Sequence, residues 1–142
     1  MRVLVAGGAG FLGSHLCDAL LERGDEVVCV DSFVTGRADN VAHLAGRTGF
    51  SLVEHDITQS CVDLPVADAV MNLASPASPK DYLAMPLETL AVGSTGTRNL
   101  LEVAVRDRAR FFMASTSEVY GVPLVHPQTE DYWGHVNPIG ER

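Results

Sequence analysis

The sequence is poor in positive charge. Its 142 residues include ten Lys plus Arg but eighteen Asp plus Glu, which gives a formal net charge of −8 and an isoelectric point near 4.9. A protein this acidic lacks the electrostatic footprint of nucleic-acid or anionic-membrane binding, and we expect neither partner. Lysine is the scarcest cation, since Lys80 is the only one. Any phosphate-bearing ligand must therefore be held by local geometry, because the overall charge opposes it.

Long apolar runs and paired cysteines are also missing. No stretch reaches the roughly 20 apolar residues of a transmembrane helix, and residues 1–6 lead into glycines without the cleavage site of a signal peptide. Cys17, Cys29 and Cys61 are odd in number and have no C-x-x-C spacing, which favours buried thiols in a reducing compartment and predicts a cytoplasmic location. The five histidines show no ligand pattern, so we expect no metal site.

What is present is an alternation of strand and helix patterns, in a chain that is 46% hydrophobic and the size of one domain. Apolar runs predict strands over residues 2–6, 26–31, 50–54, 67–73 and 110–115. Helical periodicity predicts helices over residues 11–23, 41–44 and 87–106. The prolines at positions 76, 79 and 86 predict an irregular loop. The pattern predicts an α/β fold, a doubly wound parallel sheet with its ligand beyond the carboxyl ends of the strands.

Three glycines follow the first predicted strand with the spacing G-x-x-G-x-x-G. Gly7 permits a tight turn, Gly10 lets the backbone approach a pyrophosphate, and Gly13 lets the next helix pack on the strand. That helix begins at Phe11 and Leu12, where backbone N–H groups and the positive end of the helix dipole favour phosphates. An ordinary strand-to-helix turn can have the same spacing. The flanking strand, the helix and a distal acid favour a dinucleotide site.

The distal acid is Asp31, at the end of the second predicted strand. A carboxylate there can accept hydrogen bonds from both ribose hydroxyls of NAD and would repel the 2′-phosphate of NADP, so NAD is the expected cofactor. Arg37 weakens this preference slightly, because a nearby Arg can accommodate that phosphate. The alternative interpretation of Asp31 is a solvated acid at a strand end.

Two further strand ends are candidates for cofactor contacts. Asp56 and Ile57 follow the third predicted strand, where a carboxylate and an apolar wall could meet an adenine. Leu73, Ala74 and Ser75 end the fourth, next to the topological switch point, where small residues would leave room for the nicotinamide ribose. An ordinary strand exit and tight packing at a strand end are equally good explanations from these residues alone.

The whole chain resembles the N-terminal half of the extended short-chain dehydrogenases/reductases, a family that modifies nucleotide sugars. The four segments most similar to its UDP-glucuronate decarboxylases are residues 31–37 (DSFVTGR), 73–79 (LASPASP), 115–121 (STSEVYG) and 126–140, which ends in YWGHVNPIG. The resemblance implies further cofactor contacts from Ser32, Phe33, Thr35, Gly36 and Arg37. It also implies substrate contacts from Pro79, Tyr82 and Asn137.

The implied reaction is the NAD-dependent conversion of UDP-glucuronate to UDP-xylose. It would proceed by oxidation at C4 of the sugar, loss of carbon dioxide from C6, and re-reduction. By the same resemblance, Thr116 would hydrogen-bond the sugar near C4, while Ser117 and Glu118 would lie beside C5 and C6 as catalytic residues. Related 4,6-dehydratases have an Asp at position 117 that protonates the departing hydroxyl, and Ser117 is a poor acid for that step. Half of a nucleotide-sugar dehydratase or epimerase, and a non-catalytic NAD-binding module, remain the alternatives.

The sequence departs from the family in two places. The family base is a Tyr followed four residues later by a Lys, but position 76, four residues before Lys80, is a proline. Within the predicted helix over residues 87–106, Gly93 replaces an Asn that relatives use for helix shape and proton relay. We therefore interpret residues 1–115 as a dinucleotide-binding Rossmann unit, truncated before the substrate domain, and residues 116–142 as an active-site strand end with an irregular tail. We expect the chain to be inactive alone and to form a homodimer through the helix over residues 87–106.

Overall fold

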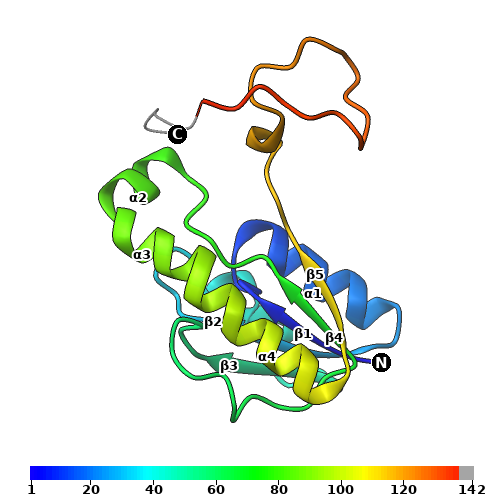
Figure 1. The fold of residues 1–142 in the computed structure, drawn as a ribbon. Coiled ribbons are helices and arrows are strands. Elements are labelled where there is room, and N and C mark those ends of the chain that lie inside the picture. Colours follow the sequence, from blue (N-terminus) through cyan, green and yellow to red (C-terminus); the bar gives the residue numbers. More distant parts are fainter. Residues whose placement is uncertain (138–142) are drawn as a thin grey trace.

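A computed structural model describes residues 1–137 and contains a five-stranded parallel sheet (Figure 1). The strand order is β3-β2-β1-β4-β5, and every neighbouring pair is parallel. The strands are β1 (Arg2–Ala6), β2 (Glu26–Asp31), β3 (Phe50–Glu54), β4 (Ala69–Asn72) and β5 (Arg110–Met113). The order reverses beside β1, so the predicted doubly wound α/β fold is confirmed, with its switch point between β1 and β4.

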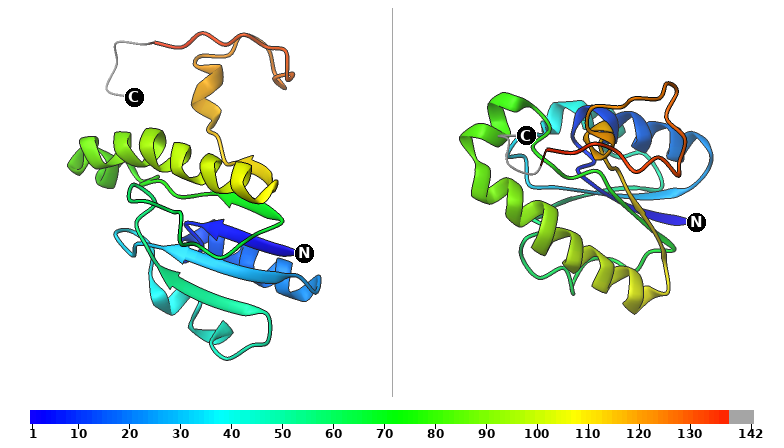
Figure 2. Two further views of the ribbon diagram at one scale, coloured as in Figure 1. Left: turned by 60° about the horizontal axis from the view of Figure 1, so that its bottom comes forward. Right: turned by 45° about the horizontal axis from the view of Figure 1, so that its top comes forward.

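Helices cover both faces of the sheet (Figures 1 and 2). Successive residues of β1 alternate between the two layers, as side chains of a strand must. Val3 and Val5 join the core under α1 (Phe11–Glu22), with Cys17, Leu20 and Leu21 of that helix. Leu4 and Ala6 join the core under α4 (Thr97–Asp107), with Leu100, Val103 and Ala104. Two 3₁₀ helices, Ala38–Asn40 and Ala42–Leu44, stand where a short helix was predicted.

The prediction of an irregular loop up to Pro86 is wrong. Two short helices occupy most of this segment, α2 (Pro79–Ala84) and α3 (Pro86–Ala91), and each begins at a proline. A proline in the first turn loses no hydrogen bond, because the first N–H groups of a helix have no acceptor within it, and its fixed φ suits the helix. The prolines therefore start these helices instead of excluding them.

The predicted longest helix is interrupted by a π-helix, Val92–Gly96, between α3 and α4. A Cβ on Gly96 would lie 2.8 Å from Ile57 Cδ1, so the absence of a side chain permits close packing there. A Cβ on Gly93 would meet nothing within 4 Å, so packing within the described residues does not require that glycine. The apolar positions divide between two surroundings: Leu100 and Ala104 are buried, whereas Leu87, Leu90, Leu101 and Val105 are exposed.

The chain leaves the sheet after β5. One short 3₁₀ helix, Ser117–Tyr120, and one bridge, Gly121 with His135, are its regular structure up to residue 137. Figure 2 shows this segment extending beyond the carboxyl end of β5. The last three residues of the motif over residues 126–140 lie outside the described residues. None of the helices described in residues 1–137 is long and apolar enough to cross a membrane.

Candidate functional site

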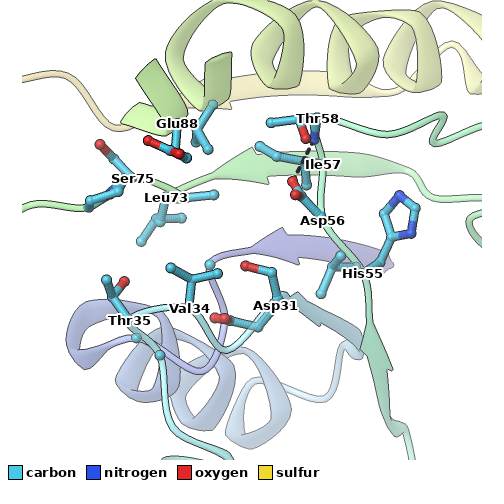
Figure 3. Close-up of a pocket in the computed structure, with 18 of the residues that line it drawn as sticks. Asp31, Val34, Thr35, His55, Asp56, Ile57, Thr58, Leu73, Ser75 and Glu88 are labelled. Atoms are coloured by element: carbon cyan, nitrogen blue, oxygen red, sulfur yellow. Dashed lines mark hydrogen bonds between the residues drawn. The ribbon is translucent and has the colours of Figure 1, made fainter. Parts of the chain in front are cut away.

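A cleft of about 220 Å³ opens at the carboxyl ends of the strands, next to the switch point (Figure 3). One side includes Asp31 at the end of β2 and Val34 after it, and the other includes Leu73, Ser75 and Glu88 (Figure 3). Most of the residues predicted to bind a cofactor line this cleft, namely Gly7, Gly10, Asp31, Ser32, Thr35, Gly36, Asp56, Ile57, Leu73, Ala74 and Ser75. The fold therefore gathers four separate sequence segments around one space.

The glycine turn between β1 and α1 is shaped by close backbone contacts. Gly7 has φ +75°, and a Cβ on it would lie 2.8 Å from the Ala74 backbone. A Cβ on Gly13 would overlap the Gly7 carbonyl oxygen. The Gly7 N–H donates to Val30 O at 2.8 Å, and the Gly10 N–H donates to Gly7 O at 3.1 Å. Side chains at Gly7 and Gly13 would clash with neighbouring backbone, so this cradle forms only with glycine at both positions.

The start of α1 supplies donors for an anion. Phe11 and Leu12 occupy the first helical positions, where backbone N–H groups have no acceptor within the helix. Gly10 is the N-cap residue and makes no side-chain cap, so no protein side chain takes the place of a ligand there. The Phe11 and Leu12 side chains are exposed. No Lys or Arg stands among the described residues of the cleft, so a pyrophosphate would be held by these N–H groups and the helix dipole.

Asp31 is held by two backbone hydrogen bonds and lies close to the Gly36 backbone. It is 8% exposed, and its carboxylate accepts hydrogen bonds from Ala9 N and Phe33 N, both at 2.9 Å. A Cβ on Gly36 would lie 2.6 Å from Asp31 Oδ1, so only a glycine leaves this carboxylate in place. Each carboxylate oxygen can accept more than one hydrogen bond. The carboxylate is thus held in one orientation and retains capacity for ligand hydroxyls.

Five predicted cofactor residues are not among those that line the cleft, namely Phe11, Leu12, Gly13, Phe33 and Arg37. Gly13 is buried beneath the glycine turn, and Phe33 packs against the core under α1. Arg37 is exposed and pairs with Asp39 at 3.6 Å, outside the lining. Asp56, which does line the cleft, accepts a hydrogen bond from Thr58 N at 2.9 Å, and this bond closes a turn around the buried Ile57 (Figure 3).

Several lining residues were missed by the sequence reasoning. They are Val30, Val34, His55, Thr58, Pro76, Met85, Glu88, Ala91 and Val92. Four of them, from Met85 to Val92, come from α3 or its ends, in and just after the segment predicted to be irregular. The signal that could have found them is the pair of prolines that open α2 and α3. A helix that crosses over to cover the sheet must begin near the carboxyl end of β4.

None of the three cysteines lines the described cleft, and two of them have raised pKa values. Burial, together with the negative charges of Asp56 and Glu102, raises the pKa of Cys61 to about 11. A side-chain hydrogen bond with Cys17, and then burial, raise the pKa of Cys29 well above its usual range. A thiol with a raised pKa is protonated at neutral pH and is a poor nucleophile.

The residues predicted to act on substrate stand apart from the cleft. Thr116, Ser117 and Glu118 are exposed, and Thr116 Oγ1 accepts a hydrogen bond from Glu118 N at 3.2 Å. Pro79 and Asn137 are also exposed, and Tyr82 is half-buried in α2. None of the six lines the described cleft, and their contact with substrate stays a prediction.

A parallel sheet of this order, a glycine turn that opens a helix, and a fixed carboxylate at the next strand end together define a dinucleotide-binding α/β domain. A comparison with protein families makes the class of this domain more specific. The family model described as GDP-mannose 4,6 dehydratase matches residues 4–138. The chain therefore belongs to that family.

Known relatives narrow the comparison. UDP-glucuronic acid decarboxylase 1 of Danio rerio is 53% identical over 99% of this chain and 33% of its own length. UDP-glucuronic acid decarboxylase 1 of Arabidopsis thaliana is 51% identical over 100% of this chain and 32% of its own length. The chain thus spans about a third of the length of these curated relatives. Among solved structures, one similar to this chain is a DesIV double mutant, a dTDP-glucose 4,6-dehydratase from Streptomyces venezuelae, with NAD and DAU bound. The comparison has a TM-score of 0.85 and 30% sequence identity, and it covers 96% of this chain and 46% of that one.

Proposed function

We propose that this chain binds NAD in the cleft at the carboxyl ends of the strands. The carrying observation is the tight glycine turn at Gly7 and Gly13, where any side chain would clash with neighbouring backbone. The N–H groups of Phe11 and Leu12 would hold the pyrophosphate, and the Asp31 carboxylate would accept hydrogen bonds from the adenosine ribose. The structural relative DesIV, which was solved with NAD, supports the same cofactor.

NAD is favoured over NADP by the charges around Asp31. A 2′-phosphate on the ribose would approach the fixed carboxylate, and two negative groups at that distance repel each other. Arg37 is the nearby cation that could compensate, but its guanidinium pairs with Asp39, and both side chains are largely exposed. A solvated cation that is already paired offers little to a second anion.

We further propose that the chain is the cofactor-binding part of a UDP-glucuronate decarboxylase. Identities of 51–53% to decarboxylases over the whole chain support this assignment. When bound, NAD would supply a hydride acceptor at C4 of the sugar and return the hydride after decarboxylation. With a ketone at C4, the C6 carboxylate is β to a carbonyl, so its bond to C5 can break with the electrons delocalised toward the ketone oxygen. Donors near that oxygen stabilise the developing charge.

The residues after β5 would act on the sugar. Thr116 would hydrogen-bond near C4, and Ser117 and Glu118 would lie beside C5 and C6, with Glu118 handling a proton. The family's base, a Tyr followed four residues later by a Lys, does not occur within these 142 residues. Lys80 is the single lysine, and the residue four positions before it is Pro76. We therefore expect no turnover by the 142-residue chain alone.

A dehydratase is the second candidate, because the family description and the structural relative DesIV both name dehydratases. Ser117 argues against it, since a hydroxyl is a poor general acid for expelling the C6 hydroxyl. A dinucleotide-binding module without turnover is the third candidate. The three candidates differ in the product formed when the missing chemistry is supplied.

The experiment joins this chain to the remaining C-terminal part of the Danio rerio relative and supplies UDP-glucuronate and NAD. We expect UDP-xylose and carbon dioxide from the fusion, measured by chromatography and gas release, and neither product from the 142-residue chain. Calorimetry of the chain with NAD is measured beside it, and saturable binding is expected. A fusion that binds NAD but forms no UDP-xylose would contradict the decarboxylase assignment, and absence of NAD binding would contradict the cofactor assignment.

We also propose that two copies of the chain associate through the continuous helical run from α3 to α4. Leu87, Leu90, Leu101 and Val105 on this run are exposed, which leaves an apolar surface in contact with water. A second copy is the occupant that we favour, and sedimentation velocity is the test. We expect a dimer for the native chain and a monomer for Leu101→Glu. A monomeric native chain at high concentration would contradict the proposal.

The cytoplasmic location stays a prediction.

A further inference from the structure

The peptide groups on either side of Ala9, at the tip of the glycine turn, are held by a segment distant in sequence. The Ala9 N–H donates to Asp31 Oδ2 at 2.9 Å. The Ala9 carbonyl oxygen accepts two hydrogen bonds, from Arg37 N at 3.1 Å and from Asn40 Nδ2 at 2.8 Å. The Ala9 side chain itself is fully buried. The strand end and the 3₁₀ turn after β2 therefore clamp the tip from both sides.

The other N–H groups of the turn donate to backbone carbonyl oxygens of the turn itself or of β2. The Gly7 and Gly8 N–H groups donate to Val30 O, and the Gly10 N–H donates to Gly7 O. The Ala9 carbonyl differs, because its acceptor capacity is met by donors about 30 residues away. Of these donors, the Asn40 amide is the one that belongs to a side chain, so a substitution can remove it without altering the backbone.

We propose that Asn40 is a positioning residue for the dinucleotide site, acting through the Ala9 carbonyl. The inference rests on the proposed NAD binding. The peptide between Ala9 and Gly10 immediately precedes α1, so its orientation sets the direction of the first N–H groups of that helix, at Phe11 and Leu12. Asp31 fixes the N–H side of Ala9 and Asn40 fixes the carbonyl side. Asn40 is not among the residues that line the described cleft.

The geometry gives Asn40 a role distinct from general stability. Asn40 is half-buried at the end of the 3₁₀ helix Ala38–Asn40, and its side-chain amide donates to a backbone carbonyl. Loss of its amide removes one hydrogen bond to a backbone carbonyl that keeps a second donor. The free energy of unfolding should therefore change little, while the orientation of the pyrophosphate donors changes. Binding of NAD, measured well below the unfolding temperature, separates the two roles.

The experiment compares calorimetric NAD dissociation constants and thermal midpoints for the native chain and two variants. Asn40→Ala deletes the donor, and Asn40→Asp keeps the size but replaces the donor by an acceptor facing the Ala9 carbonyl. From the usual net value of one hydrogen bond we expect roughly 3- to 10-fold weaker NAD binding for Asn40→Ala. We expect a larger loss for Asn40→Asp, since its carboxylate would repel the Ala9 carbonyl oxygen instead of donating to it. Amide NMR shifts of Phe11 and Leu12 should move in both variants.

Arg106→Ala is the matched control. Arg106 also donates from its side chain to backbone carbonyls, Val62 O at 2.6 Å and Leu64 O at 3.1 Å, but far from the glycine turn. We expect it to lower the thermal midpoint and leave NAD affinity within twofold. Native-like NAD affinity in whichever Asn40 variant folds would overturn the inference while leaving the proposed function intact. Failure of the native chain to bind NAD would instead overturn the proposed function, and the inference with it.

Discussion

Residues 1–113 and residues 114–137 differ in how their functional side chains are held. In the first region, Asp31 is fixed by two backbone donors and the glycine turn by contacts with β2 and β4. In the second, none of the residues is buried, and Thr116 to Glu118 are exposed. The first region orients its site through its own sheet and helices, whereas the second holds its candidate residues with little packing.

This difference indicates which of the two functional sites is preorganised. A cofactor site needs fixed donors and acceptors, and the core of the first region supplies them. A catalytic site needs groups held within reach of one another, and the described part of the second region does not bring its candidates to the cleft. Cofactor binding and turnover should therefore be separable in this chain. Four substitutions test that separation.

The largest effect is expected for Gly13→Ala. Its methyl group would overlap the Gly7 carbonyl oxygen, so the turn and the start of α1 must separate. We expect a loss of about 3 kcal/mol in the free energy of unfolding, at the upper end for overpacking, and roughly hundredfold weaker NAD binding. Gly93→Ala is the control, because a Cβ there meets nothing within 4 Å. Gly13→Ala with native NAD affinity would show that the cradle is not the binding site.

The next largest effect is expected for Asp31→Ala. The substitution removes the acceptor of Ala9 N and Phe33 N and the proposed ribose contact. Charge-assisted hydrogen bonds contribute about 1.5–3 kcal/mol, so NAD binding should weaken roughly 10- to 100-fold. The preference for NAD over NADP should fall at the same time, because the repelling charge is gone. An unchanged NAD-to-NADP ratio would contradict the role given to this carboxylate.

A third substitution, Asp107→Asn, tests stability away from the site. Arg106 forms two hydrogen bonds with Asp107, at 2.6 and 2.7 Å, and Ala67 N donates to it at 3.0 Å. The hydrogen bonds with Arg106, ahead of that with the Ala67 backbone, hold the pKa of the nearly buried Asp107 below its usual range. Near neutral pH we expect a loss of about 1–3 kcal/mol in the free energy of unfolding, with NAD affinity unchanged.

The pH dependence of this loss has a definite sign. The folded-state pKa of Asp107 is lowered, so its contribution is complete above the unfolded value near 3.8 and is lost as the pH falls through the folded value. The difference between the native chain and Asp107→Asn should therefore be constant above about pH 5 and shrink below pH 4. Chemical denaturation at several pH values measures it. A difference that persists undiminished toward pH 2 would contradict the ion pair as its source.

The smallest effect is expected for Glu118→Gln, in the exposed second region. The free energy of unfolding should change by less than about 0.5 kcal/mol, and NAD binding should not change. In the active fusion, the same substitution should lower the rate of UDP-xylose formation, because the proposed proton transfer is lost. Full activity of the substituted fusion would remove Glu118 from the chemistry. A large change in NAD affinity would instead show that the two regions are not separable.

The strands and the glycine turn were predictable from sequence because their signals are local. Apolar runs over residues 2–6 and 26–31, and the spacing of Gly7, Gly10 and Gly13, match the structure directly. Pro79 and Pro86 misled because a proline is compatible with the first turn of a helix as well as with a loop.

The remaining features depend on contacts between distant segments. Glu88 and Val92 reach the cleft only because α3 leads into the helix α4, which packs on β4. Asn40 reaches Ala9 only because the turn after β2 folds over the glycine turn. The π-helix at Gly93 and Gly96 also follows from no local pattern, although Gly96 marks the close approach to Ile57. Local sequence patterns predict most helices and strands of the fold, whereas tertiary packing determines which side chains share a site.

Amide NMR mapping of NAD binding to the 142-residue chain tests the central claim most directly. If residues 1–113 form a preorganised dinucleotide site, NAD should shift the amides of the glycine turn, of residues 31–37 and of residues 73–75. The amides of residues 116–118 should shift little, since those residues lie outside the cleft. Saturable shifts with this distribution are the predicted result. Absence of shifts in the glycine turn, or shifts centred on residues 116–118, would contradict the account.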